Sequence, residues 1–355
     1  MPSAQGESTQ AAAGRAIDDA TVWGRDDFPD DRSWVRPLPE AMLADIDAAL
    51  PALRARRLHP PDITATDFPL PNSAAFLAEI DQAIEAGPGF VLLSGFPIDR
   101  YGYDDIVLAY CGVMAHFGRI AIQSRAGEFV VDVSDKGRAL GPGARGHYGR
   151  DALPFHADGA SAVSLLTLKT APVGGRSLLV SGAAIYNAVL KEHPEHLPVL
   201  YRGFHHHRRE ERGPEDPRVT PWRTPVFAFY GDQFHIVYVR PSIDYCEAEG
   251  VVITAAERAA LDCVDAVIAR PEMQVSMALR PGDLQIVNNF LVLHSRTAYE
   301  DGPEDRRHLV RLWLDNPRSR RNGPGKMDWY MPEHSRFLKT RGHLLEGYVP
   351  AANRR

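Results

Sequence analysis

Three side chains that lie far apart in the sequence have the types that bind a ferrous ion. His156 and Asp158 stand two positions apart in the segment LPFHADG, and His294 follows an apolar run in RPGDLQIVNNFLVLHSR. On an extended segment, side chains two apart point to the same face, whereas on a helix they would diverge. Two histidines and one carboxylate on one face leave three adjacent coordination positions open, as in non-haem Fe(II) oxygenases. The competing interpretation is a chance His-x-Asp pair in an exposed loop or around a core histidine.

Two arginines in the segment RRHLVRLWL are candidates for binding an anion. As a strand, residues 306–314 place Arg307 and Arg311 on one face and apolar residues on both faces, so the strand is expected to be buried. Buried guanidinium groups are costly unless they meet anions. The partners are either acidic side chains of the protein or a bound dicarboxylate. A ferrous ion, Asp158 and a chelating 2-oxo dicarboxylate leave one negative charge, which one arginine would neutralise.

The elements that must position these residues change in type along the chain. The first third predicts helices over 39–58, 73–86 and 102–117, with Pro51 expected to kink or interrupt the first and a buried strand at 90–94. The remainder predicts short strands with helical inserts at about 182–191 and 254–268. This texture favours a mainly β protein of the α+β class, with an antiparallel sandwich or jelly roll and helices packed outside. The expected strands are 129–133, 163–168, 177–180, 226–230, 234–240, 274–279, 283–287, 291–295 and 307–314.

Composition restricts the classes of function. The chain has 355 residues and a formal net charge of −6, so it lacks the positive field that non-specific nucleic-acid binding needs. It has no apolar run long enough for a membrane span and no signal-peptide pattern. The three cysteines form no Cys-x-x-Cys pair. The sequence therefore predicts a protein of the reducing cytoplasm without nucleic-acid or membrane partners.

Several motifs, taken in order, resemble one enzyme family. They are GFVLLSGFP, FHAD, APVGGRSLLVSG, RPGDLQIVNN, VLHSRTAYED and RRHLVRLWL, and they run from about residue 89 to 315. In this order they resemble the taurine dioxygenase and clavaminate synthase-like Fe(II)/2-oxoglutarate-dependent oxygenases.

The resemblance implies a double-stranded β-helix core and a set of residue roles. His156, Asp158 and His294 would be the Fe(II) ligands, and Arg307, thirteen residues beyond His294, would bind the distal carboxylate of 2-oxoglutarate. Ser177 stands where the family usually has a threonine that contacts the same carboxylate. Arg311 would reach the C1 carboxylate of 2-oxoglutarate or an anionic group of the substrate. An acidic residue at 158 argues against the halogenating variants, which need that position free.

The reaction that the resemblance implies is oxidation of an unactivated C–H bond by O₂, with decarboxylation of 2-oxoglutarate to succinate. Hydroxylation is the default outcome, with desaturation or ring formation as variants. A small polar metabolite is the expected substrate, an amino acid or another carboxylate, because the arginines offer cationic anchors. The alternatives are a protein-bound or carrier-bound amino acid, or a ligand-binding sensor without turnover. The sequence leaves the oligomeric state open, a homo-oligomer included.

Three further residues are candidate substrate contacts, each with a structural alternative. Arg240 is expected on a strand face with His235 and Tyr238, where an ion pair is the alternative. Gln123 and Tyr148 precede the metal segment, and each could serve core packing or a turn instead. The charged stretch 208–224 is either a lid over the site or a surface loop.

The expected organisation is one catalytic domain with peripheral parts. Residues 1–20 form a disordered tail, 21–120 a helical part packed on the core, 121–316 the catalytic β-helix with its inserts, and 317–355 a C-terminal extension.

Overall fold

The computed structural model describes residues 14–30, 32–124, 127–137, 141, 148–209, 217–316 and 319. The α-helices are α1 (Glu40–Arg56), α2 (Ala74–Glu85), α3 (Tyr103–Met114), α4 (Gly182–Glu192), α5 (Leu197–Arg202), α6 (Arg240–Asp244) and α7 (Ala255–Ile268). The strands are β1 (Arg36–Pro37), β2 (Phe90–Ser94), β3 (Arg119–Ala121), β4 (Val130–Val133), β5 (Leu153–His156), β6 (Ala162–Lys169), β7 (Val173–Gly174), β8 (Ser177–Ser181), β9 (Phe227–Tyr230), β10 (Gln233–Ile236), β11 (Val275–Met277), β12 (Leu284–Asn288), β13 (Val292–Arg296), β14 (Tyr299–Glu300) and β15 (His308–Asp315).

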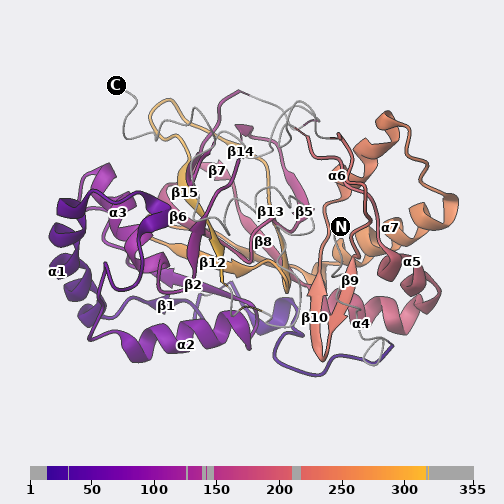
Figure 1. Cartoon of the computed structure of the whole chain (residues 1–355), viewed down its shortest axis with the longest axis horizontal. Helices are drawn as coiled ribbons and strands as arrows, with labels where there is room; N and C mark the ends of the chain where they lie inside the picture. The colour runs from indigo at the N-terminus through magenta and orange to yellow at the C-terminus, as the bar shows by residue number, and fades with distance from the viewer. Residues whose placement is uncertain are drawn as a thin grey trace.

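Two sheets, made mainly of antiparallel strands, form the centre of the molecule (Figure 1). The larger has the order β1-β2-β12-β6-β15-β3, with β4 also paired to β15, and the smaller has the order β11-β8-β13-β5. One hydrophobic cluster joins the two, with Leu92, Val163 and Trp313 from the larger sheet and Leu179 and Val275 from the smaller. The sheets are therefore the two layers of a jelly roll, and the expected fold class is confirmed.

Strand β15 shows how the sequence alternation specifies this packing. Leu309 and Trp313 face the smaller sheet, whereas Val310, Leu312 and Leu314 belong to the cluster on the opposite face. Because successive side chains of a strand point to opposite faces, a strand that is apolar on both must lie between two layers. The face that carries Arg307 and Arg311 therefore points between the sheets.

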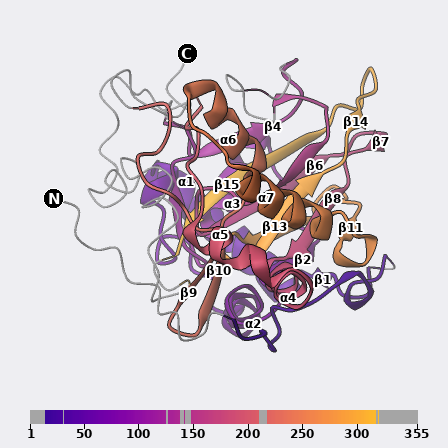
Figure 2. The same cartoon turned by 90° about the vertical axis from the view of Figure 1, so that its right-hand side faces the viewer.

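Helices cover the outer face of each sheet, as Figures 1 and 2 show. Helices α1, α2 and α3 pack on the larger sheet, with Met42, Ile46, Ile80 and Tyr110 among the buried residues. Helices α4, α5 and α7 pack with the β9–β10 hairpin on the outer side of the smaller sheet, around buried Tyr186. These helical layers shield the outer faces of the central strands from solvent.

The structure corrects three local expectations. Helix α1 continues through Pro51, which is exposed, while Leu50 and Leu53 beside it are buried in the hydrophobic cluster that also contains residues of α3 and the larger sheet. The strand expected over 234–240 ends at Ile236, because Pro241 sits at a position that favours a helix start and Arg240 opens α6. The tail expected to reach residue 20 is fixed from Gly14 onward, where the Gly14 amide donates to the Tyr186 hydroxyl.

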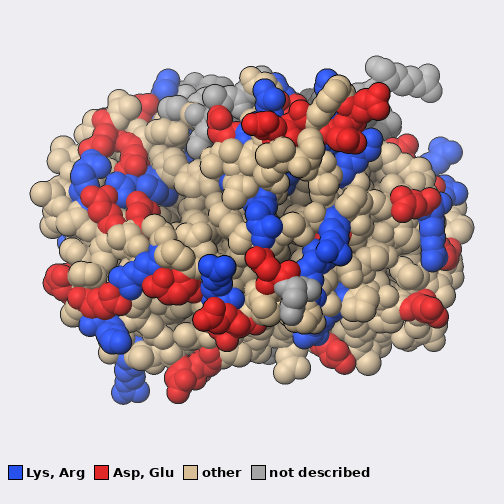
Figure 3. Space-filling view, turned by 180° about the vertical axis from the view of Figure 1, so that it is seen from behind, with Lys and Arg blue, Asp and Glu red and all other residues tan. Residues whose placement is uncertain are grey.

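Other expectations fall outside the described residues. They concern residues 1–13, residues 210–216 of the stretch 208–224 that was expected as a lid or a surface loop, and most of the extension after Asn316. Figure 3 shows acidic and basic side chains interspersed over one face of the molecule. In the described ranges, every helix is too short or too polar to cross a lipid bilayer.

A capping box at the start of α7 allows a test of stability against pH. Glu257 is buried; its carboxylate accepts from the Thr254 amide and from Arg223. Burial opposes ionisation, but the stabilising effect of these hydrogen bonds on the carboxylate is larger. The pKa of Glu257 is therefore lowered from 4.5 to about 2. A lowered folded-state pKa stabilises the protein above pH 4.5, and this contribution is lost as the pH falls towards 2.

We therefore expect Glu257→Gln to lower the free energy of unfolding by about 1–2 kcal/mol at pH 7. The deficit relative to wild type should narrow as the pH falls from 5 towards 3, when both are measured by urea denaturation. A deficit that stays constant over this range would show that the charge of Glu257 does not matter.

Candidate active site

The pairing of two strands brings the three expected metal ligands together. Strands β5 and β13 are antiparallel neighbours, and in their register His156 lies directly opposite His294. The centroids of the two imidazole rings are 4.4 Å apart. Asp158, just beyond β5, places one carboxylate oxygen 3.8 Å from His156 Nε2 and the other 3.7 Å from His294 Nε2. Two segments more than a hundred residues apart thus form one cluster.

Hydrogen bonds and charges hold this cluster in a ligand-ready state. The Pro154 carbonyl can only accept, so His156 Nδ1 donates to it at 2.9 Å and Nε2 keeps its lone pair towards Asp158. Burial lowers the pKa of His156, which favours the neutral ring. Burial would raise the pKa of Asp158, but Arg311 and both imidazoles hold it well below its usual range. At neutral pH the cluster therefore offers a neutral His156 imidazole and an ionised Asp158 carboxylate beside the His294 ring.

The donor set fits a ferrous ion. One ligand atom from each of His156, Asp158 and His294 lies within 4.8 Å of the other two, and all three side chains are only partly exposed. All three line the same pocket, so an ion that they hold would be accessible from it. Nitrogen and carboxylate donors in this number, with an open side, are the ligands of non-haem iron.

The cluster lies in the wall of a pocket of about 540 Å³, including its opening to solvent. The space is lined by strands of both sheets and opens to solvent, so small molecules can enter it. Its lining combines apolar side chains, three of them from β4 and β6, with neutral polar groups, the metal-ligand candidates and three arginines. The lining residues are Val133, Leu153, His156, Asp158, Val163, Leu165, Ser177, Leu279, Gln285, His294, Ser295, Arg296, Arg307 and Arg311.

Arg307 and Ser177 lie in the part of the pocket that suits a carboxylate. Arg307 is 5 % exposed; its guanidinium carbon lies 5.2 Å from the Tyr299 ring centroid, and its Nη1 has no hydrogen-bond partner among the described residues. Ser177 donates to Gln285 Oε1 at 3.1 Å. Burial, together with the nearby Arg296, lowers the pKa of Arg307 to about 10, so it stays charged at neutral pH. A buried cation with an unused donor is a site for an anion.

Known sequences decide which family has this arrangement. The profile described as "Taurine catabolism dioxygenase TauD, TfdA family" matches residues 54–313. The chain belongs to the TauD/TfdA dioxygenase family. Among curated relatives, FR-33289 synthase of Streptomyces rubellomurinus is 32% identical over 305 residues, which are 83% of this chain and 89% of that protein. The taurine hydroxylase-like protein SAT17 of Stachybotrys chartarum is 28% identical over 325 residues, which are 87% and 82% of the two chains.

Solved structures agree with this TauD/TfdA membership at the level of the fold. An asparagine oxygenase in complex with Fe(II), 3-hydroxyasparagine and succinate superposes with a TM-score of 0.61 at 19% identity, over 82% of this chain and 98% of that one. The non-haem iron oxygenase OrfP, in complex with Fe and α-ketoglutaric acid, gives 0.58 at 16% identity, over 82% and 97%. As a TauD/TfdA dioxygenase, the protein is a non-haem Fe(II)/2-oxoglutarate-dependent oxygenase that uses O₂.

The residues expected to contact substrate have different positions in this dioxygenase. Gln123 is buried; it accepts from Arg311 Nε at 2.7 Å and donates to the Arg311 carbonyl, so it fixes that arginine in place. Tyr148 lies under the Lys136 ammonium and is not among the pocket-lining residues. Arg311 is 8 % exposed, with Nη1 3.8 Å from an Asp158 oxygen.

Arg240, expected as a candidate substrate contact with an ion pair as the alternative, forms ion pairs in the structure. Its guanidinium pairs with Asp244, Asp262 and Asp265 at 2.9, 2.9 and 2.6 Å, and it does not line the pocket. Because β10 ends at Ile236, Arg240 opens helix α6 and does not share a strand face with His235 and Tyr238. The ion-pair alternative is the one that holds.

Two residues of the site were missed by the sequence interpretation. Arg296, two positions after His294, lines the pocket with its guanidinium carbon 4.7 Å from the Tyr299 ring centroid. Its alternation with His294 on one strand face is a signal that could have found it. Trp313 donates from Nε1 to Asp158 Oδ2 at 2.8 Å, and the alternation of β15 already places it on the face of Arg311.

The Trp313 hydrogen bond gives a prediction for iron affinity. Partners that orient a metal ligand typically contribute 10–100-fold to affinity. We expect Trp313→Phe to weaken Fe(II) binding about tenfold, measured by anaerobic titration, with turnover near wild type at saturating iron. Trp34→Phe is the matched control, because the Trp34 indole donates to the Pro29 carbonyl instead. Unchanged iron affinity in Trp313→Phe would mean that this hydrogen bond does not support the ligand.

Proposed function

We propose that this dioxygenase hydroxylates a C–H bond of a small metabolite that carries an anionic group, an amino acid or another carboxylate. His156, Asp158 and His294 hold Fe(II), Arg307 and Ser177 bind the distal carboxylate of 2-oxoglutarate, and Arg311 lies beside the metal. The observation that carries the proposal is the convergence of the three ligands from β5 and β13 on one pocket that Arg307 also lines.

Each side chain has a task that its contacts support. Iron with 2-oxoglutarate supplies the oxidising chemistry when both are bound. Asp158 is held ionised by Arg311 and oriented by Trp313, which donates to the carboxylate oxygen that faces His294 and leaves the other oxygen towards His156. Arg307 offers an unused buried donor to the pocket; the Ser177 hydroxyl, which donates to Gln285 here, lines the same pocket and would turn its hydrogen to a bound carboxylate. The apolar residues Val163 and Leu165 exclude water from the wall opposite.

The charge of the pocket supports an anionic substrate. Arg296, Arg307 and Arg311 with a ferrous ion bring five positive charges to the lining. Asp158 and dianionic 2-oxoglutarate bring three negative charges, so a positive excess is left for a third partner. A buried excess charge is costly unless a counter-charge meets it. Among the structural relatives, the asparagine oxygenase and OrfP were solved with hydroxylated amino acids, which carry such a carboxylate.

The experiment is a substrate screen with matched pairs. Protein loaded with Fe(II) under anaerobic conditions is mixed with 2-oxoglutarate, O₂ and one candidate, and succinate is measured. Each carboxylate candidate is paired with the alcohol or amide that lacks the charge. We expect substrate-dependent succinate with a carboxylate, and kcat/KM on the order of 100-fold lower for its neutral partner. Product mass after reaction under ¹⁸O₂ distinguishes hydroxylation from desaturation or ring formation.

Two results would contradict the proposal. Equal turnover of a carboxylate and its neutral partner would show that the enzyme does not require an anionic substrate. Turnover of a carrier-bound or peptide-bound amino acid alone, with no free metabolite accepted, would replace the small molecule with a tethered one.

For its compartment we propose the cytoplasm, which the free thiols of Cys111, Cys246 and Cys263 support.

A further inference from the structure

A second group of metal-binding side chains lies in the helical layer outside the smaller sheet. His193 follows the end of α4, His196 ends the short 3₁₀ helix η4 (Pro194–His196), and Cys263 lies in α7. One ligand atom from each of the three lies within 4.8 Å of the other two. None of them lines the pocket of the iron cluster.

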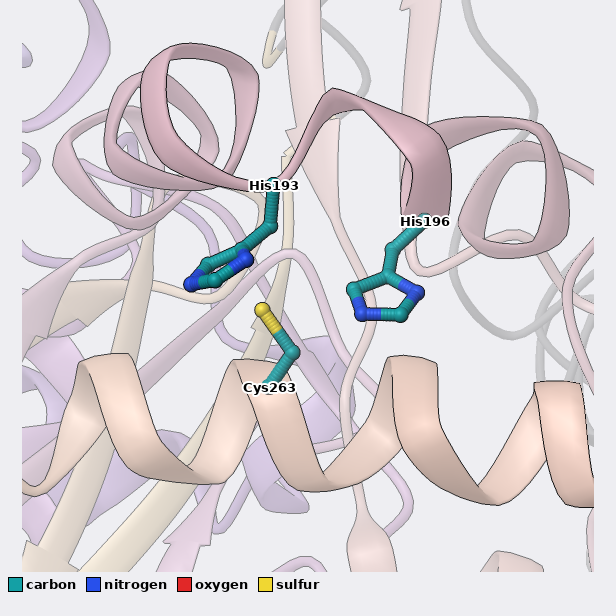
Figure 4. A group of neighbouring side chains, drawn as sticks. All are labelled: His193, His196 and Cys263. Atoms are coloured by element: carbon teal, nitrogen blue, oxygen red, sulfur yellow. The ribbon is translucent and has the colours of Figure 1, made fainter.

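The local sequence explains why both rings face α7. The motif His-Pro-Glu-His turns the chain immediately after α4, because Pro194 sits at the first position of η4 and cannot continue the preceding hydrogen-bond pattern. The two imidazole rings have centroids 6.0 Å apart with an interplanar angle of 33°. Figure 4 shows the Cys263 sulfur rising from α7 between the two rings. A space lined by two nitrogens and one sulfur is left among them.

Charged neighbours make this space favourable for a cation. The Glu195 carboxylate oxygen Oε1 lies 3.6 Å from His193 Nδ1 and 4.0 Å from His196 Nε2. Glu192 stands nearby, paired with Arg270 at 2.7 Å. A divalent ion held by a thiolate and the Glu195 carboxylate would be neutral overall, and two imidazoles would complete four ligands.

We infer that His193, His196 and Cys263, with Glu195 as the fourth ligand, bind a divalent transition metal of the zinc class. A thiolate with two imidazoles suits Zn²⁺ or Co²⁺, whereas the all-nitrogen-and-oxygen iron cluster has no soft donor. Binding releases the thiol proton of Cys263 to solvent. With four protein ligands the site is structural: it ties the α4–η4 corner to α7.

The test isolates this site by removing the other one. In the full-length variant His156→Ala/His294→Ala, the iron cluster has lost both imidazoles. We expect this protein, freed of metal with a chelator, to bind one equivalent of Co²⁺ and to develop a thiolate-to-cobalt charge-transfer band in the near ultraviolet. Zn²⁺ should displace the cobalt and raise the thermal unfolding midpoint by several degrees.

Cys263→Ser on the same background should abolish the band and weaken Zn²⁺ binding by on the order of tenfold or more. Cys246→Ser is the matched control, because the Cys246 thiol donates a hydrogen bond to the Ser242 carbonyl and a serine hydroxyl can donate the same bond. Cys263→Ser alone should leave iron-dependent succinate formation unchanged. If Cys263→Ser does not fold, His196→Gln and His193→Gln carry the same test.

Three results would overturn the inference. The absence of a charge-transfer band, with Co²⁺ bound or not, would exclude a thiolate ligand. Zn²⁺ affinity equal in Cys263→Ser and its parent would place the ion elsewhere. A band that survives in His193→Gln and His196→Gln would exclude the imidazoles.

Discussion

Replacing His156 with alanine is expected to reduce substrate-dependent succinate formation on the order of a thousandfold. His156 and His294 face each other across β5 and β13. Removing the His156 ring leaves only His294 and Asp158 as ligands, with an empty position where the ring was. A loss of this size corresponds to about 4 kcal/mol in the activation free energy. The measurement is succinate formed per enzyme at saturating 2-oxoglutarate, together with the iron bound per chain after anaerobic loading.

The control for this loss is a histidine outside both clusters. His59 is exposed at the start of a 3₁₀ helix, and His59→Ala should keep wild-type iron content and turnover. Circular dichroism should show the same secondary structure in both variants. If His156→Ala retained full iron-dependent turnover, the assignment of the iron site to this cluster would be wrong.

Replacing Arg307 with glutamine is expected to raise the KM for 2-oxoglutarate about 100-fold. The guanidinium is buried, and its Nη1 has no partner among the described residues, so a bound carboxylate would supply one. Loss of one member of a buried charge pair costs about 2–5 kcal/mol, because the other charge is left without its counter-ion. A 2-oxo acid with an uncharged tail should then be used about as well as 2-oxoglutarate, since the cationic end of the pocket is gone.

Two other arginines make this prediction specific. Arg240→Gln should leave the KM for 2-oxoglutarate unchanged, because Arg240 pairs with Asp244, Asp262 and Asp265 outside the pocket. Arg296→Gln should alter the response to the substrate more than the response to 2-oxoglutarate. The opposite pattern, with KM for 2-oxoglutarate raised by Arg296→Gln and unaffected by Arg307→Gln, would show that Arg296 holds the cosubstrate.

Much of the candidate site could be predicted because local spacing carries it. His156 and Asp158 share a face through the two-residue period of extended chain. The same period placed Arg307 and Arg311 on one face of β15, and the apolar residues on both faces predicted that the strand lies between layers. These features depend only on neighbours in the sequence, so a single sequence contains them.

What sequence spacing could not provide is contact between distant segments. Arg240 was misplaced because the turn at Pro241 ends the strand early, and Pro51 was tolerated because it lies on the exposed side of α1. The role of Gln123 as a support for Arg311 depends on a contact between residues that are 188 positions apart in the sequence.

The sequence by itself determined the family, and it predicted the candidate ligand types and the faces on which they lie. Only the tertiary structure decided that His294 stands opposite His156, that Arg296 and Trp313 lie at the site, and that Cys263 of α7 meets His193 and His196 at the α4–η4 corner. The physical reason is that alternation along a strand is fixed by local backbone geometry. Strand register and helix packing, by contrast, depend on which buried surfaces fit together across the whole chain.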